Sequence, residues 1–180
     1  MPPLPVPAKY RQVPPPLETT GAGGPPMKLL APDVHLIAPI VAVGNSGGTL
    51  GVPDDVHTLG WWRSGAVAGS PEGTIVIDGH VDSAGYVDSA GQGIGALATI
   101  ATMQPGQRLT LTTGSGPVSY LVQARRTYRK NQLPTELFTT TGPAQLALIT
   151  CGGPFNTTSK HYRDNIVVYA TPTMSATQPR

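Results

Sequence analysis

Residues 146–153, LALITCGG, form an apolar run that ends at the only cysteine of the chain, Cys151, and at two glycines. A second apolar run lies within residues 161–170, HYRDNIVVYA, where Arg163 stands twelve residues after the cysteine. Short apolar runs bounded by glycine and polar residues predict buried strands. We expect the two glycines to turn the backbone sharply. Two neighbouring strands would then bring the thiol and the guanidinium to the same end of a sheet.

Two interpretations of Cys151 stay open at this point. A thiol beside a cation is the arrangement of a nucleophile with an anion-stabilising partner. A free cysteine can equally be a small residue of a buried core. The rest of the sequence must decide between a reactive and a structural thiol.

The composition favours one all-β domain. A chain of 180 residues can build one substantial core. Its 22 glycines and 20 prolines, with few long helical patterns, favour a turn-rich β architecture. The 12 basic and 10 acidic residues are scattered, and we interpret the one basic cluster, at 125–130, as a solvated strand edge. We therefore expect no nucleic-acid partner.

The sequence excludes disulfide stapling and a membrane span within these residues. One cysteine cannot form an internal disulfide. No apolar run approaches the ~20 residues that a membrane helix requires, and the longest, 36–43, is interrupted by Pro39. No charged segment followed by an apolar one opens the chain as in a signal peptide. Either the protein is cytosolic, or its export signal lies outside this chain.

We expect three segments along the chain. Residues 1–30 are rich in proline and glycine, which predicts an extended arm or stalk that contributes no core. Residues 31–172 should form the folded domain, and residues 173–180 a C-terminal tail. Within the domain, the glycine-rich stretch 85–95 predicts a mobile surface loop.

The pattern predicts about eight short strands and two short helical turns. Strands are expected at residues 35–43, 49–52, 59–62, 74–77, 108–112, 119–127, 146–151 and 166–170, and helical turns at 97–103 and 134–138. The first two strands should form a hairpin, with Pro39 marking an edge strand. Of the adjacent Trp61 and Trp62, one should point inward and the other cover surface. Such a set fits a sandwich or a closed barrel, and closure is favoured because it removes exposed edges.

His80 is the histidine best placed for chemistry. It follows the strand predicted at 74–77 through Gly79, so its ring can project from the end of the strand. The three other histidines are expected to be structural: His35, His57 and His161. Cys151 and Arg163 also stand where apolar runs end or begin. A thiolate, an imidazole and a cation that converge at strand ends suit acyl transfer.

Three motifs resemble those of the sortases: IDGHVD at 77–82, LITC at 148–151 and YRDN at 162–165. The stretch from about 32 to 170 resembles sortase class F, including GWW at 60–62 and the two glycines after the cysteine. The resemblance implies an all-β fold, a closed eight-stranded sortase-like barrel with short helical turns. It also implies a cysteine transpeptidase that cleaves a Leu-Pro-X-Thr-Gly sorting signal between Thr and Gly, through a thioacyl intermediate, and passes the acyl group to an amine.

By residue match, the resemblance implies Cys151 as nucleophile, His80 as acid and base, and Arg163 as the cation for the oxyanion and the substrate. Four further residues are expected to contact substrate or support the site: Thr150, Asp82, Gly152 and Asn165. For Thr150, a substrate contact and a purely structural role both stay open. The family often has Thr where this chain has Ala147, which should cost a structural contact and leave the chemistry intact. No acidic cluster resembles the calcium site of another sortase class, so we expect no metal and no cofactor.

The resemblance also implies the partners and the location. The acyl donor would be the sorting-signal peptide of a surface protein. The acceptor would be an amine of a peptidoglycan stem or cross-bridge, or a pilin lysine. The enzyme would act on the extracellular face of the cytoplasmic membrane of a Gram-positive bacterium. We expect its membrane anchor to precede the arm and to lie outside this chain.

Three other classes of protein are alternatives to a sortase. An L,D-transpeptidase-like enzyme tends to have its histidine and cysteine close together in sequence, whereas His80 and Cys151 are 71 residues apart. A papain-like peptidase needs a helix that begins at its cysteine, and the run into Cys151 is strand-like. A non-catalytic β-barrel that binds peptides or glycans would keep Cys151 buried and unreactive, with His80 and Arg163 far apart.

Overall fold

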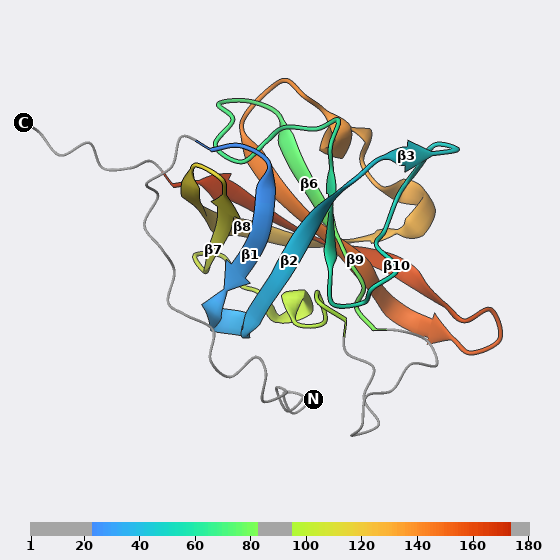
Figure 1. The fold of residues 1–180 in the computed structure, drawn as a ribbon. Helices are drawn as coiled ribbons and strands as arrows, with labels where there is room; N and C mark the ends of the chain where they lie inside the picture. The colour runs from blue at the N-terminus through green and yellow to red at the C-terminus, as the bar shows by residue number, and fades with distance from the viewer. Residues whose placement is uncertain (1–22, 83–94, 174–180) are drawn as a thin grey trace, which may run out of the picture.

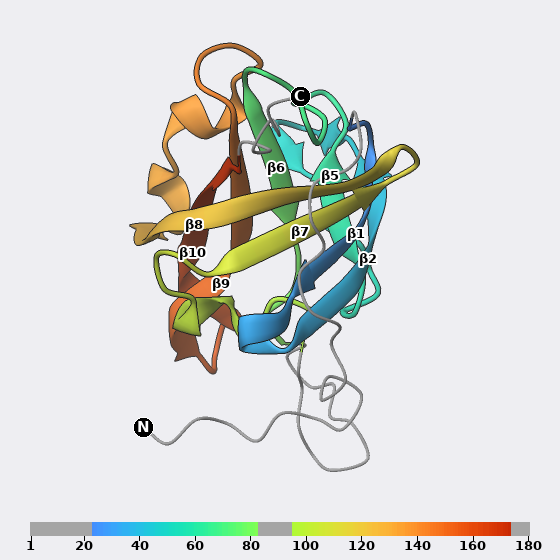
Figure 2. The same cartoon turned by 90° about the vertical axis from the view of Figure 1, so that its left-hand side faces the viewer.

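A computed structural model of the chain describes residues 23–82 and 95–173, and these fold into a closed β-barrel (Figures 1 and 2). The barrel strands are β1 (Pro26–Ala31), β2 (Leu36–Val43), β5 (Leu59–Trp62), β6 (Thr74–Asp78), β7 (Arg108–Thr113), β8 (Gly116–Arg129), β9 (Gln145–Asn156) and β10 (His161–Pro172). Four 3₁₀ turns connect them: η2 (Pro32–Val34), η3 (Ile100–Thr102), η4 (Lys130–Gln132) and η5 (Thr135–Phe138). The predicted all-β class, the closed eight-stranded barrel and the short helical turns are confirmed.

The strands follow one another around the barrel in the order β1-β2-β5-β6-β9-β10-β8-β7. Two neighbouring pairs, β2 with β5 and β6 with β9, run parallel, and the other pairs are antiparallel. Pairing of β1 with β7 closes the ring, so no barrel strand is left with an unpaired edge. Within the described part of the chain, no helix has the length and apolar character needed to cross a membrane.

The number of barrel strands was predicted correctly, but one member differs. β1 begins at Pro26, inside the segment expected to be a coreless arm, and its Leu29 and Leu30 are buried. The stretch 49–52, expected in the barrel, instead contributes β4 (Thr49–Leu50), which pairs with β3 (Asn45–Ser46) in a small separate hairpin. The predicted hairpin with strand β2 is therefore wrong, because β2 pairs with β1 and β5. Residues 1–22 and most of the predicted loop 85–95 lie outside the described residues.

Pro39 does not mark an edge strand, which corrects the sequence expectation. Strand β2 has neighbours on both sides. Pro39 stands opposite Lys28 of β1, and pairing with β5 begins only at Ile40. The proline is thus accommodated just before the paired stretch with β5, where the ladder needs no donor from it.

The two glycines after Cys151 do not turn the chain, contrary to the prediction. Strand β9 continues through them to Asn156 and forms a hairpin with β10 that projects from the barrel (Figure 1). The register shifts between Tyr162 and Asp164, so β9 carries a bulge at this point. Gly153 has φ 73°, and a Cβ atom there would overlap the Asp164 carboxylate. The glycine is needed for the bulge and for close approach of this acid.

Trp61 and Trp62 occupy opposite faces of the barrel wall, as predicted, but both are buried. Trp61 belongs to the barrel interior, together with the predicted helical face of Leu97, Ile100 and Met103. Trp62 lies on the outer face, where its ring meets Phe138 of η5 edge-on at 5.5 Å and its indole N–H donates to Asn45 Oδ1 at 2.6 Å. The outer face of this wall is therefore covered by η5 and by the β3–β4 hairpin.

Candidate functional site

The parallel pairing of β6 with β9 sets Cys151 beside His80. Asp78, the last residue of β6, stands opposite Ile149 of β9. His80 lies two residues after Asp78, and Cys151 lies two residues after Ile149. Because side chains alternate between the two faces of a sheet, both residues point to the outer face. Both side chains are half-buried, and both line one cavity of about 490 Å³. The sequence prediction placed both groups at strand ends: His80 follows the end of β6, whereas Cys151 lies within β9, which continues to Asn156.

Thr150 of β9 bonds to the residue that follows the end of β6. Its buried hydroxyl donates to the Gly79 carbonyl at 2.8 Å, and the Gly79 N–H donates to the Ile149 carbonyl at 3.2 Å. The residue directly before His80 is thereby bonded to the residue directly before Cys151. Thr150 also reaches the cavity wall. Of the two roles left open by the sequence, the hydrogen bond supports the structural one.

The 490 Å³ cavity is an open groove on the outer face of the barrel wall. Its lining residues are Gly48, Thr49, Leu50, Val52, Asp78, Gly79, His80, Lys130, Leu133, Phe138, Ile149, Thr150, Cys151 and Asn165. The β3–β4 hairpin and the segment that follows it form one wall, η4 and η5 the other, and β6, β9 and β10 the floor. Most of this surface is apolar, which suits an extended peptide with apolar side chains.

A second cavity, of about 280 Å³, opens on the other side of the cysteine. Its lining residues are His80, Val81, Asp82, Lys130, Cys151, Phe155, Lys160, His161 and Tyr162. His80, Cys151 and Lys130 line both cavities. The thiol therefore stands where two approaches meet, as a reaction with two substrates requires.

Asp82 and Tyr162 are joined by a hydrogen bond beside the second cavity. The Tyr162 hydroxyl donates to Asp82 Oδ2. Burial raises the pKa of Tyr162 to about 12, and the hydrogen bond to Asp82 and the negative charges of Asp82 and Cys151 add to this shift. The tyrosine therefore stays protonated at neutral pH and remains a donor to the acid.

Two other residues predicted to support the site have clear positions. Asn165 of β10 stands directly opposite Cys151 and lines the larger cavity. Gly152 is buried, and a Cβ atom there would lie 2.5 Å from Ile166 Cδ1. Gly152 therefore has a packing reason to lack a side chain.

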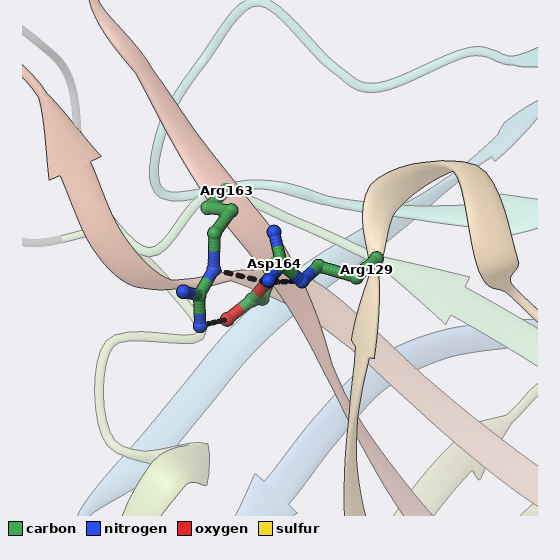
Figure 3. Close-up of polar contacts among 3 residues, drawn as sticks. All are labelled: Arg129, Arg163 and Asp164. Atoms are coloured by element: carbon green, nitrogen blue, oxygen red, sulfur yellow. Dashed lines mark hydrogen bonds and ion pairs between the residues drawn. The ribbon is translucent and has the colours of Figure 1, made fainter.

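Arg163 lies on β10, two residues before Asn165, which stands opposite Cys151. Its side chain is paired with Asp164 (Figure 3). Its Nε and Nη2 donate to the two Asp164 carboxylate oxygens at 2.8 and 2.7 Å. The Arg163 side chain is 48% exposed and that of Asp164 only 4%, and Arg129 Nε of β8 lies 3.7 Å from the same acid. Hydrogen bonding to Arg163 lowers the pKa of Asp164, and the charges of both arginines act in the same direction. Arg163 is absent from the lining of the two cavities described above.

Sequence reasoning missed two polar residues of the groove. Lys130, assigned to a solvated edge, is exposed and lines both cavities. Asp78 is only 6% exposed, and its Oδ1 has no hydrogen-bond partner among the described residues. Burial raises its pKa to about 7, against the smaller lowering effect of a backbone hydrogen bond. The signal for Asp78 was present in the sequence, because a carboxyl directly follows three β-branched residues of a buried strand.

The described residues contain no group of three or more histidine, cysteine or acidic side chains that could hold a metal ion.

Comparison with known proteins identifies the family of the chain and supports its fold. The model of the Sortase domain family matches residues 29–173. Sortase A from Corynebacterium diphtheriae is similar in structure, with a TM-score of 0.61 and 18% identity over 86% of this chain and 64% of the other. Sortase A from Listeria monocytogenes gives 0.59 and 18% over 86% and 88%, and Sortase C1 from Streptococcus agalactiae gives 0.58 and 14% over 87% and 69%. No curated protein sequence matches the chain.

Proposed function

The chain belongs to the sortase family, and we propose that it is a transpeptidase that cleaves a Leu-Pro-X-Thr-Gly sorting signal between Thr and Gly and transfers the acyl group to an amine. The observation that carries the proposal is the placement of Cys151 and His80 side by side, where β9 runs past the end of β6, in one apolar groove. The motifs around these two residues support an assignment to class F.

The reaction takes two steps at the thiol. The Cys151 sulfur attacks the threonine carbonyl, and the tetrahedral intermediate collapses to a thioester as the glycine amine leaves with a proton from His80. The acceptor amine then attacks the thioester and gives a proton to His80. Collapse of this second intermediate forms the new amide and releases the Cys151 sulfur, to which His80 returns the proton.

The two cavities suit the two substrates. The larger groove offers Leu50, Val52, Leu133, Phe138 and Ile149 to the leucine and proline of the signal. The smaller cavity reaches the same sulfur from the other side and provides a path for the acceptor. Because both paths end at Cys151, the acceptor can enter while the acyl group still occupies the larger groove.

We assign the oxyanion cation to Arg163, in a conformation in which it has left Asp164. The ion pair is half-exposed on the arginine side, and such pairs contribute little to stability. Arg129 stays 3.7 Å from Asp164 and can keep this acid neutralised when Arg163 turns away. Lys130 is the competing cation, because it already faces the groove.

We further propose that the enzyme acts at the outer surface of a Gram-positive cell. In this setting the donor is a surface protein, and the acceptor is a peptidoglycan amine or a pilin lysine. These assignments follow from the family and from the motif resemblance.

The experiment that tests the function uses peptides with the Leu-Pro-X-Thr-Gly pattern, varied at X, together with a panel of amines. We expect mass spectrometry to detect an acyl adduct on Cys151 and, with a suitable amine, the transpeptidation product. Cys151→Ala should form neither and should keep the circular dichroism spectrum, because it removes one sulfur atom from a half-buried site. Peptide that binds the wild type without being cleaved would favour the non-catalytic binding module.

A further inference from the structure

His80 has a hydrogen-bond partner that neither the motifs nor the proposed reaction assigns. The ring Nε2 lies 2.8 Å from the main-chain carbonyl oxygen of Pro53, which belongs to the segment after the β3–β4 hairpin. A carbonyl oxygen can only accept, so Nε2 must carry the proton in this contact. The neutral ring then has its free lone pair on Nδ1, because the bond made by one ring nitrogen fixes the state of the other.

The Pro53 carbonyl is held in place by its surroundings. The proline ring restricts φ, which stiffens the backbone at this residue. The ring also fills the space over Gly60 of β5: a Cβ atom at Gly60 would lie 3.0 Å from Pro53 Cδ. The chain that follows is closed by the Asp55 carboxylate, which accepts from the His57 N–H at 3.1 Å and from the Thr58 hydroxyl at 2.6 Å. The acceptor for His80 is therefore part of a packed turn.

Two acids of the site, Asp82 and Asp78, have surroundings of their own. Asp82 accepts the hydroxyl of Tyr162. Asp78 lies on the groove floor, with its Oδ1 directed toward Gly60, 2.5 Å from where a Cβ atom would lie. A neutral carbonyl thus takes the place that an acid holds in many catalytic histidine sites. It orients the ring as a neutral hydrogen-bond acceptor.

We propose that the main-chain carbonyl of Pro53 is the positioning group for His80, and that Nδ1 is the nitrogen that exchanges protons during the reaction. The proposal builds on the transpeptidase function given above. In the first step Nδ1 takes the thiol proton and delivers it to the glycine amine as the C–N bond breaks. In the second step Nδ1 takes a proton from the acceptor amine and returns it to the sulfur as the C–S bond breaks. The N–H of Nε2 stays hydrogen-bonded to the Pro53 carbonyl oxygen throughout.

The tautomer of His80 can be read in the free protein without any substrate. Protein labelled with ¹⁵N in histidine should show a long-range ¹⁵N–¹H pattern in which Nε2 of His80 carries the proton, at a pH where the ring is neutral. Comparison with His80→Gln assigns the signals among the four histidines of the chain. A pattern with the proton on Nδ1 would overturn the proposal, whatever the activity of the protein.

A pair of isomeric residues at position 80 tests the second part of the proposal, that Nδ1 is the nitrogen that exchanges protons. Nδ1-methylhistidine blocks the nitrogen that we assign to proton transfer, and its turnover should fall about a hundredfold or more, to the level of His80→Ala. Nε2-methylhistidine loses only the bond to Pro53, and it should keep clearly more turnover than the other isomer. Turnover of the Nδ1-methyl protein equal to or above that of the Nε2-methyl protein would refute the assignment. If the wild type itself cleaves no peptide, the proposed function fails, while the spectrum still decides the tautomer.

Discussion

At the scale of single residues, Asp78 is the acid of the groove with the most unusual environment. It is buried on the floor, and its pKa is raised to about 7 by burial. A raised pKa means that the folded state binds the proton more tightly than the unfolded state. The contribution of Asp78 to stability is therefore largest in acid and is lost as the pH rises from about 4 to about 7, by at most about 4 kcal/mol for a shift of this size.

We predict that Asp78→Asn removes this loss. The free energy of unfolding, measured by urea titration at pH 5 and pH 8, should fall with pH in the wild type and stay nearly level in the variant. Asp33→Asn serves as the matched control, because Asp33 is exposed. The control should retain the wild-type slope. A slope unchanged by Asp78→Asn would show that this carboxyl is not the group responsible.

Arg163 supplies the second prediction at this scale. Arg163→Lys keeps the charge but loses the planar fork that can hold two oxygens at once. We expect kcat to fall about a hundredfold, the usual cost of removing one aimed oxyanion donor, while Cys151 still reacts readily with a small alkylating agent. Peptide cleavage and alkylation measured side by side separate these two effects.

Two control variants show which cation serves the reaction. Arg129→Lys alters the other arginine beside Asp164 and should change kcat little. Lys130→Gln removes the cation that lines both cavities, and it should cost less than Arg163→Lys. Near-wild-type turnover of Arg163→Lys, with strong loss in Lys130→Gln, would transfer the role to the lysine.

At the scale of elements, the bulge of β9 decides where Arg163 and Asp164 lie. The residue types and spacing of Cys151, His80 and Arg163 were sufficient to predict that their backbones meet. They were not sufficient to predict the direction of the arginine side chain, because that depends on the register shift between Tyr162 and Asp164. A glycine pair is compatible with both a turn and a bulge, and only the pairing partner distinguishes them.

We predict that Gly153→Ala destabilises the protein by more than backbone strain alone. The left-handed φ of 73° should cost an alanine ~1–2 kcal/mol, and the new Cβ would also displace the Asp164 carboxylate. Gly106→Ala is the control, because Gly106 has φ 90° and open space where its Cβ would lie. Urea unfolding should show a larger loss for Gly153→Ala. Equal losses in the two variants would mean that the overlap with Asp164 is relieved without cost.

Strand pairing is the part of the fold that the local sequence pattern could not predict. The apolar run of β6 and the run into Cys151 predicted both strands, but nothing in either run specifies that they pair in parallel. β1 was missed because its apolar residues follow directly on a proline and glycine tract that resembles a linker. Lys130 and Pro53 were missed for a related reason: connecting segments bring them to the site, and their positions depend on the closed barrel.

At the scale of the whole molecule, function depends on a barrel wall that is covered on its outer face. The interior of the barrel is filled by its own apolar core. The groove forms where η4, η5 and the β3–β4 hairpin cover β6, β9 and β10 from outside. The parallel pairing of β6 with β9 and the hydrogen bond from Thr150 to Gly79 keep His80 and Cys151 next to each other on this wall.

The position of β1 in the closed ring leads to a last prediction, about where the folded domain begins. The described contacts start at Gly24, whose N–H donates to the Ala68 carbonyl at 2.8 Å and whose carbonyl accepts the Ala68 N–H at 3.0 Å. β1 then pairs with β2 on one side and β7 on the other. A protein that lacks residues 1–22 retains every one of these contacts, so its melting temperature should stay within about 2 °C of the wild-type value.

A protein that lacks residues 1–31 should fail to fold, because it loses β1, opens the ring between β2 and β7, and exposes the core that Leu29 and Leu30 cover. Thermal unfolding followed by circular dichroism checks both truncations. A cooperative transition near the wild-type temperature in the longer truncation would show that the barrel does not need β1. Unfolding of the protein that lacks residues 1–22 would show that these residues contribute to stability, against the expectation that their composition cannot build a core. Peptide cleavage by the protein that lacks residues 1–22 then reports separately whether the arm affects access to the groove.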